Sequence, residues 1–142
     1  MPYASQAQLE DRYGTSMLIE LTDRASPPAD AIDVDVIDRA LADADALIDG
    51  FLKGRYLLPL SSTPPLVVDL ALAIAVYKLH RNVASDKVRR DYEDAMKVLR
   101  DIAAGTVRLD VDGAEPTASG ASGVKTNDRD RPLTPDNLKG FI

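Results

Sequence analysis

The sequence predicts an all-α fold: a small helical bundle of two short N-terminal helices and three longer helices, followed by one short β-strand and an extended C-terminal arm. Apolar residues recur at steps of three and four through most of the first 104 positions, which is the helical spacing. Hydrophobic residues make up 45% of the chain, as in a globular protein. A chain of 142 residues is one domain by size and can bury about two-thirds of its unfolded surface.

Composition excludes several classes of function. The chain has no cysteine, which rules out disulfides, thiolate metal sites and cysteine nucleophiles. Its net charge of -6 argues against a nucleic-acid-binding surface, which normally carries a basic patch. The N-terminus lacks a basic stretch followed by an apolar one, so no signal peptide is expected. The longest apolar run, 66–79, is shorter than the roughly 20 residues that a membrane span needs.

Two short helices are expected near the N-terminus. Ser5 and Gln8 form a capping-box pattern that starts the first helix, and Gly14 is a natural stop for it. The second helix covers about residues 16–21. A proline-containing loop follows at 23–30 and separates these helices from the longer ones.

Three longer helices form the body of the predicted bundle. The first opens at Asp33 or Asp35, where acidic residues suit the helix dipole, and Gly54 is its expected stop. The second runs from residue 65 to about 82 and is apolar nearly all round, so neighbours must cover it on more than one side. The third covers about 86–104 and has a single apolar stripe, which is typical of a half-exposed helix.

The C-terminal part changes character. Residues 106–112 alternate at period two and predict a short strand, which has no partner strand in this chain and is therefore expected to pair with another copy or another protein. Residues 113–127 are rich in Gly, Ala, Ser and Thr and predict a flexible linker. Apolar residues return at 131–142, as in a docking arm. The predicted division is a helical domain with its terminal strand over 1–112, and a linker and arm over 113–142.

No motif in the chain predicts catalysis or ligand binding. A Ca²⁺ loop needs oxygen-bearing side chains at positions 1, 3 and 5 and Gly at 6, whereas the run that starts at Asp33 has Ile37 at position 5. The run that starts at Asp110 has Ala114 there. His80, the single histidine, is expected at a helix C-terminus, where it is more often structural than catalytic. We therefore expect no metal, no cofactor and no enzymatic activity.

Arg55 leaves two interpretations open. It lies in a short corner between two apolar segments, next to Tyr56. Its guanidinium could lie along the apolar surface or cap carbonyls at a helix end, which is a structural role. Alternatively, it could reach carboxylates of a partner chain.

Several stretches of the chain together match a known family. They are Tyr3-Ala4-Ser5-Gln6-Ala7-Gln8-Leu9-Glu10-Asp11-Arg12-Tyr13-Gly14, Leu21-Thr22-Asp23-Arg24, Ile37-Asp38-Arg39-Ala40-Leu41-Ala42-Asp43-Ala44, Ile48-Asp49-Gly50-Phe51-Leu52, Arg55-Tyr56-Leu57-Leu58-Pro59-Leu60, Pro64-Pro65-Leu66 and Leu99-Arg100-Asp101-Ile102-Ala103-Ala104-Gly105. In combination they resemble a family of small Mu-like phage and prophage proteins that look like head–tail connector (neck adaptor) proteins. The resemblance covers about residues 3–112.

The resemblance implies a structural role in the virion neck. In related tailed phages twelve copies form a homo-oligomeric ring below the portal protein and above a stopper or tail-completion protein, and DNA passes through the lumen only as cargo. No membrane is involved, and assembly takes place in the cytoplasm of the bacterial host. The family has no catalytic residues to transfer. Its matched positions look like fold and interface determinants, chiefly Arg12, Asp23, Arg24, Asp38, Arg39, Asp49, Arg55, Tyr56 and Pro59.

The residues expected at interfaces come from the corner, the strand and the arm. They are Arg55, Tyr56, Val107, Leu109, Val111, Leu133, Leu138, Phe141 and Ile142. An alternative from another functional class is a monomeric helical binding or regulatory module whose tail is disordered. An enzyme would need a polar cleft that the sequence does not indicate.

Overall fold

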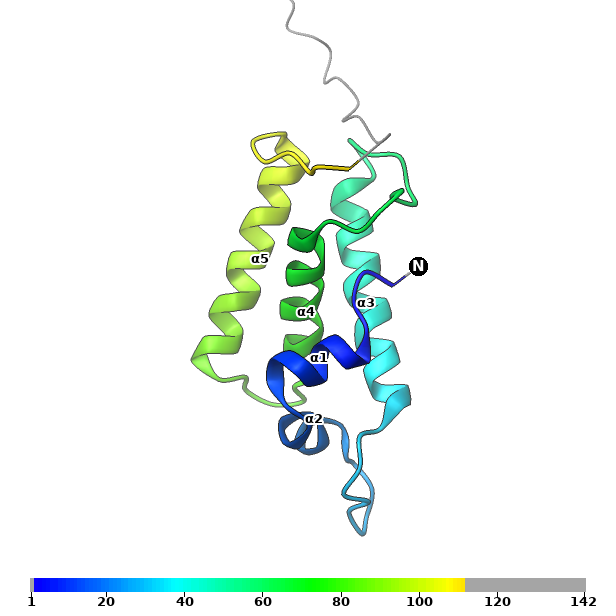
Figure 1. Cartoon of the computed structure of the whole chain (residues 1–142). Helices are drawn as coiled ribbons and strands as arrows, with labels where there is room; N and C mark the ends of the chain where they lie inside the picture. The colour runs from blue at the N-terminus through cyan, green and yellow to red at the C-terminus, as the bar shows by residue number, and fades with distance from the viewer. Residues whose placement is uncertain (1, 112–142) are drawn as a thin grey trace, which may run out of the picture.

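The computed structural model describes residues 2–111 and confirms the all-α prediction. The described part of the chain contains five helices: α1 (Gln6–Tyr13), α2 (Thr15–Thr22), α3 (Val34–Leu52), α4 (Pro65–Leu79) and α5 (Asp86–Ala104). The three long helices lie side by side in alternating directions, with α4 between α3 and α5 (Figure 1). α1 and α2 cross the half of the bundle where α4 ends and α5 begins (Figure 1).

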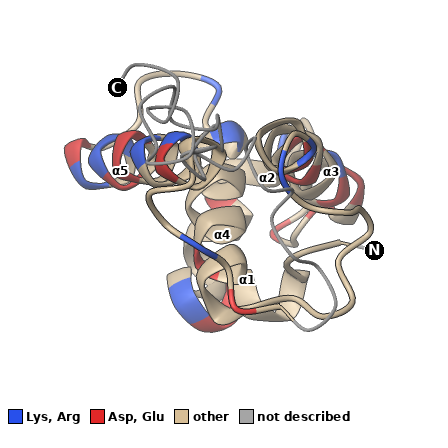
Figure 2. Ribbon diagram, turned by 90° about the horizontal axis from the view of Figure 1, so that it is seen from above, with Lys and Arg blue, Asp and Glu red and all other residues tan. Residues whose placement is uncertain are grey.

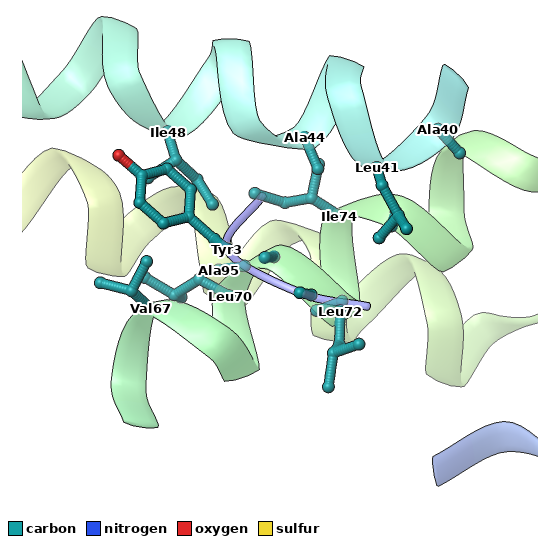
Figure 3. Close-up of a cluster of buried hydrophobic side chains, with 14 of the residues drawn as sticks. Tyr3, Ala40, Leu41, Ala44, Ile48, Val67, Leu70, Leu72, Ile74 and Ala95 are labelled. Atoms are coloured by element: carbon teal, nitrogen blue, oxygen red, sulfur yellow. The ribbon is translucent and has the colours of Figure 1, made fainter. Parts of the chain in front are cut away.

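Helix α4 is the centre of the core. It carries apolar residues on every side, and nine of its residues are buried. These are Val67, Leu70, Ala71, Leu72, Ala73, Ile74, Ala75, Val76 and Leu79. Helix α3 covers one side of α4 and helix α5 covers the other, as the all-round apolar pattern predicts. The N-terminal segment covers part of the seam between α3 and α4, where Tyr3 lies near Ile48, Val67 and Leu70 (Figure 3).

Local capping explains where the helices begin. The capping box of α1 is present, since the Gln8 N–H donates to Ser5 Oγ at 3.3 Å and the Ser5 N–H donates to Gln8 Oε1 at 2.9 Å. Asp33 caps α3 by accepting the Asp35 N–H at 3.0 Å. Ser85 caps α5 through the Val88 N–H at 3.3 Å. Each cap satisfies a backbone donor that the helix itself leaves without a partner.

Two polar side chains hold the loop between α2 and α3. Thr22 is fully buried; its hydroxyl donates to the Leu18 carbonyl at 2.7 Å and accepts the Asp33 N–H at 3.0 Å. The carboxylate of Asp23 accepts N–H groups from Ala25, Ala29 and Asp30, and these bonds lower the pKa of Asp23. The end of α2 is thereby tied to the start of α3.

Helix α4 ends earlier than expected. It stops at Leu79, so Lys78 lies in its last turn while His80 and Arg81 lie beyond it. His80 has extended backbone dihedrals and its Nδ1 lies 2.8 Å from the Val76 carbonyl oxygen. The side chain of His80 thus contacts a carbonyl that the end of the helix leaves free.

The predicted strand is wrong. Residues 106–111 have no strand structure, and the N–H groups of Thr106 and Val107 both point back to the Asp101 carbonyl, at 2.9 and 3.2 Å. The alternation is real but has another cause, because Leu109 is buried and its two apolar neighbours at period two pack partly against the same core. A segment that lies across the end of a helical bundle buries every second residue, just as a strand edge would. The pairing of this strand with another copy therefore loses its basis.

Candidate interaction surfaces

The corner after α3, which begins at Arg55, binds the end of α5. Arg55 Nε donates to the Ala103 carbonyl at 2.7 Å, and its Nη2 donates to the Ala104 carbonyl at 2.9 Å. These carbonyls belong to the last turn of α5, which has no intrahelical donor for them. The capping interpretation of Arg55 is therefore confirmed, although the helix it caps is α5 and not its own neighbour α3. Gly105 makes room for the guanidinium, because a Cβ at this residue would lie 2.5 Å from Arg55 Cζ.

Tyr56 forms a hydrogen bond with the segment that follows α5. Its hydroxyl accepts the Leu109 N–H at 2.9 Å, in a buried hydrogen bond between residues 53 positions apart in sequence. Tyr56 is only 4% exposed and Leu109 only 7%. Arg55 thus binds the end of α5, and the adjacent Tyr56 binds the segment that follows α5.

The structure brings together five of the residues expected at interfaces, but it uses them internally. Arg55, Tyr56, Val107, Leu109 and Val111 meet at one end of the bundle, and Tyr56 and Leu109 have almost no surface left for a partner. The other four lie outside the described residues: Leu133, Leu138, Phe141 and Ile142.

Large apolar side chains that sequence reasoning missed are exposed at both ends of the bundle. Leu57, 69% exposed, lies in the segment between α3 and α4. Val83, 95% exposed, lies in the loop between α4 and α5, and Val34, 50% exposed, begins α3. Figure 1 places the first segment at one end of the bundle and the other two at the opposite end. In the described chain no other large hydrophobic residue is exposed to this degree, so the helix flanks lack such residues.

An acidic groove lies between the N-terminal segment and α3. It has a volume of about 670 Å³, and its lining includes Asp38, Asp45 and Asp49 together with apolar residues and the polar residues Ser5 and Gln6. The Tyr3 N–H donates to Asp45 Oδ1 at 3.0 Å and the Tyr3 hydroxyl donates to Asp49. Burial raises the pKa of Tyr3, and its bond to the Asp49 carboxylate raises it further. Burial also raises the pKa of Asp45; the Tyr3 N–H opposes this shift and the charge of Asp49 adds to it.

A basic hollow lies where the end of α4 meets α3 and the start of the α2–α3 loop. It measures about 110 Å³, and three cations from different elements line it: Arg24, Arg39 and Lys78. Asp43 is the single carboxylate in its lining. None of the three cations has an ion pair or hydrogen bond within residues 2–111.

A third groove, of about 450 Å³, lies between α1, α4 and α5. Four of its charged residues form two ion pairs within the chain. Arg12 Nη1 lies 2.5 Å from Asp69 Oδ1, and Lys87 Nζ lies 2.8 Å from Asp91 Oδ2. Viewed from above, the long exposed helix α5 carries alternating acidic and basic residues (Figure 2). This face is a solvated helix surface with its own exposed ion pairs, which add little to stability.

The described residues contain no candidate metal site. They contain no group of three or more His, Asp or Glu side chains that could hold a metal ion. Asp33 and Asp35, the start of the faint Ca²⁺ pattern, are the cap and first turn of α3. The run from Asp110 continues outside the described residues. What residues 2–111 offer is a set of surfaces: two apolar ends, an acidic groove and a basic hollow.

Comparison with known proteins shows the family. The family model described as "Bacteriophage Mu, Gp36" matches residues 3–127, most of the chain. The chain belongs to the bacteriophage Mu Gp36 family. The Mu-like prophage FluMu protein gp36 of Haemophilus influenzae is 32% identical over 140 residues, covering 99% of this chain and 98% of the relative. Gene product J of Escherichia phage Mu is 28% identical over 142 residues, covering all of both chains.

Family membership confirms the phage part of the expected identity. The Gp36 family match also extends past residue 112, where the resemblance was expected to end, into the linker-like segment. Within residues 2–111 no helix is both long enough and apolar enough to cross a membrane.

Proposed function

We propose that this Gp36-family protein is a structural, non-enzymatic virion protein, a head–tail connector. In this proposal several copies, twelve by analogy with related phages, form a ring between the portal protein and a stopper or tail-completion protein. DNA passes through the lumen as cargo. The ring belongs to the neck of the virion and assembles in the host cytoplasm.

The observation that carries the proposal is the pair of apolar ends. A connector must contact one partner above and a different partner below, and exposed apolar side chains mark such contacts. Leu57 is exposed at one end of the bundle, and Val34 and Val83 are exposed at the other. A monomeric module with one binding face would need exposed apolar side chains at only one end of the bundle.

The charge of the body supports the same role. The chain has 23 acidic and 17 basic residues. A surface with excess acid repels phosphates, so a ring built from it lets DNA pass without binding it. The described chain ends at Val111, on the same end of the bundle as the corner that contains Leu57 (Figure 1). We therefore assign this end to the portal, which the C-terminal arm would also contact.

Substitutions at the two ends test the proposal. Leu57→Asp is expected to weaken capture by the purified portal protein and to leave binding to the stopper unchanged, and Val83→Asp is expected to do the reverse. Both residues are too exposed for their substitution to disturb the core. Glu93→Lys, on the exposed face of α5, is the matched control and should bind both partners. If both end variants bind both partners as the unaltered chain does, and virions lack the protein, the monomeric regulatory module becomes the better account.

A further inference from the structure

Two surfaces of opposite charge lie on different flanks of α3. Asp38, Asp45 and Asp49 are spaced by seven and four residues and therefore share one face of the helix, which lines the acidic groove. Arg39 and Asp43 lie about 100–140° further round, at roughly 100° per residue, and line the basic hollow. One helix thus presents carboxylates on one side of the molecule and an arginine on another.

The basic hollow lacks the partner that its charges require. Arg24, Arg39 and Lys78 converge from the α2–α3 loop, from α3 and from the last turn of α4, which are far apart in sequence. Cations gathered in this way repel one another unless an anion lies among them. Asp43 supplies one negative charge against three positive ones, and no ion pair within residues 2–111 involves any of the four.

The acidic groove is the complementary surface. Its lining includes three carboxylates and no Lys or Arg side chain. The side chain of Asp38 is exposed and makes no hydrogen bond within the described residues, while the carboxylates of Asp45 and Asp49 each accept only the one bond from Tyr3. A carboxylate can accept several hydrogen bonds, so this groove keeps capacity for donors from outside the chain.

We propose that the two surfaces are the halves of one interface between successive copies of this chain, with the basic hollow of each copy against the acidic groove of the next. The inference rests on the proposed function, since a ring needs such a contact. The unlike halves make the interface heterologous, and a heterologous interface closes into a ring or extends into a filament. A second copy is the occupant that the charges favour, because the acidic groove offers three carboxylates to a hollow whose three cations have only Asp43.

The absence of cysteine permits a direct test. Asp43→Cys places a thiol in the basic hollow and Ala46→Cys places one in the acidic groove, both at exposed positions. The two full-length variants, one carrying an affinity tag, are mixed at high concentration and treated with a short bis-maleimide. The mixed pair should cross-link severalfold more than either variant with itself, and the yield should fall as salt is added. A yield no higher than that of Asp43→Cys with Glu93→Cys, an exposed control on α5, overturns the proposal.

Charge reversal tests the complementarity itself. Arg39→Asp in the Asp43→Cys chain should lower the mixed yield severalfold, and so should Asp38→Arg in the Ala46→Cys chain. Combining both reversals should restore the yield, because the charges are again opposite. All four side chains are exposed, and circular dichroism verifies that each variant keeps its helix content. Unchanged yields in the single reversals contradict the pairing.

The interface and the proposed function fail in different ways. If purified virions contain a ring of the chain but the mixed cysteine pair does not cross-link, the interface is wrong and the connector role stands. If the pair cross-links and virions lack the protein, the copies associate through these surfaces but do not form a connector. Selective cross-linking of the basic hollow to another acidic protein, and not to a second copy, also refutes the interface.

Discussion

Tyr56→Phe removes a single oxygen atom and isolates the contact that fixes the end of the described chain. The Tyr56 hydroxyl is the acceptor for the Leu109 N–H at 2.9 Å, and both residues are buried. Without it the N–H has no acceptor, and a buried donor without a partner costs about 1–3 kcal/mol. We therefore expect the free energy of unfolding to fall by about 1–3 kcal/mol, with a decrease in Tm of roughly 3–5 °C for each kcal/mol.

The assay combines denaturant unfolding with amide hydrogen exchange. Tyr77→Phe is the matched control, because Tyr77 stacks on Tyr92 and none of its contacts in the described chain depends on its hydroxyl. This control should change stability by less than about 0.5 kcal/mol. The Leu109 amide should exchange slowly in the unaltered protein and quickly in Tyr56→Phe, while amides of α4 remain protected. If Tyr56→Phe is as stable as the control and Leu109 stays protected, residues 106–111 are held by something other than the corner.

Three further predictions concern the corner, the acidic groove and the arm. In thermal unfolding, Gly105→Ala should destabilise the protein by more than about 1 kcal/mol, since φ at this residue is +85° and the new Cβ displaces Arg55. Gly50→Ala, at an exposed position of α3, should instead stabilise the protein by about 0.4–1 kcal/mol. The pKa of Asp45 is higher in the folded protein than its ordinary value of 3.8. The contribution of Asp45 to stability is therefore fully present below pH 3.8 and is lost as the pH rises through the folded pKa. Asp45→Asn should remove this pH dependence from the measured Tm. Deletion of residues 125–142 should weaken assembly on the portal, and equal assembly of the truncated chain refutes the docking arm.

Local chemistry in the sequence was sufficient to place the starts of three helices. Ser5, Asp33 and Ser85 cap helices by bonds to residues two or three positions away, so their spacing alone indicates the start. The end of α4 was harder, because cations after Lys78 suit either the last turn of a helix or the loop beyond it. The prediction of a strand at 106–111 was wrong because an alternation at period two indicates only that every second residue is buried. That burial can be against a sheet or against the end of a helical bundle.

The surfaces depend on contacts between remote residues and could not be predicted from spacing. Arg55 reaches carbonyls 48 and 49 positions away, so the helix end that it caps was not evident. The basic hollow gathers Arg24, Arg39 and Lys78 only after α2, α3 and α4 have packed. Leu57 belongs to an apolar corner whose neighbours Tyr56 and Leu58 are more buried, and sequence alone does not tell which of them remains exposed.

Electron cryomicroscopy of the virion neck tests the central claim most directly. The account predicts a closed ring of this chain on the particle axis, with the Leu57 end against the portal and the Val83 end against the next neck protein. It also predicts that the acidic and basic flanks of α3 face adjacent copies. A neck in which the portal contacts the stopper directly, with no density for this chain between them, would contradict the account.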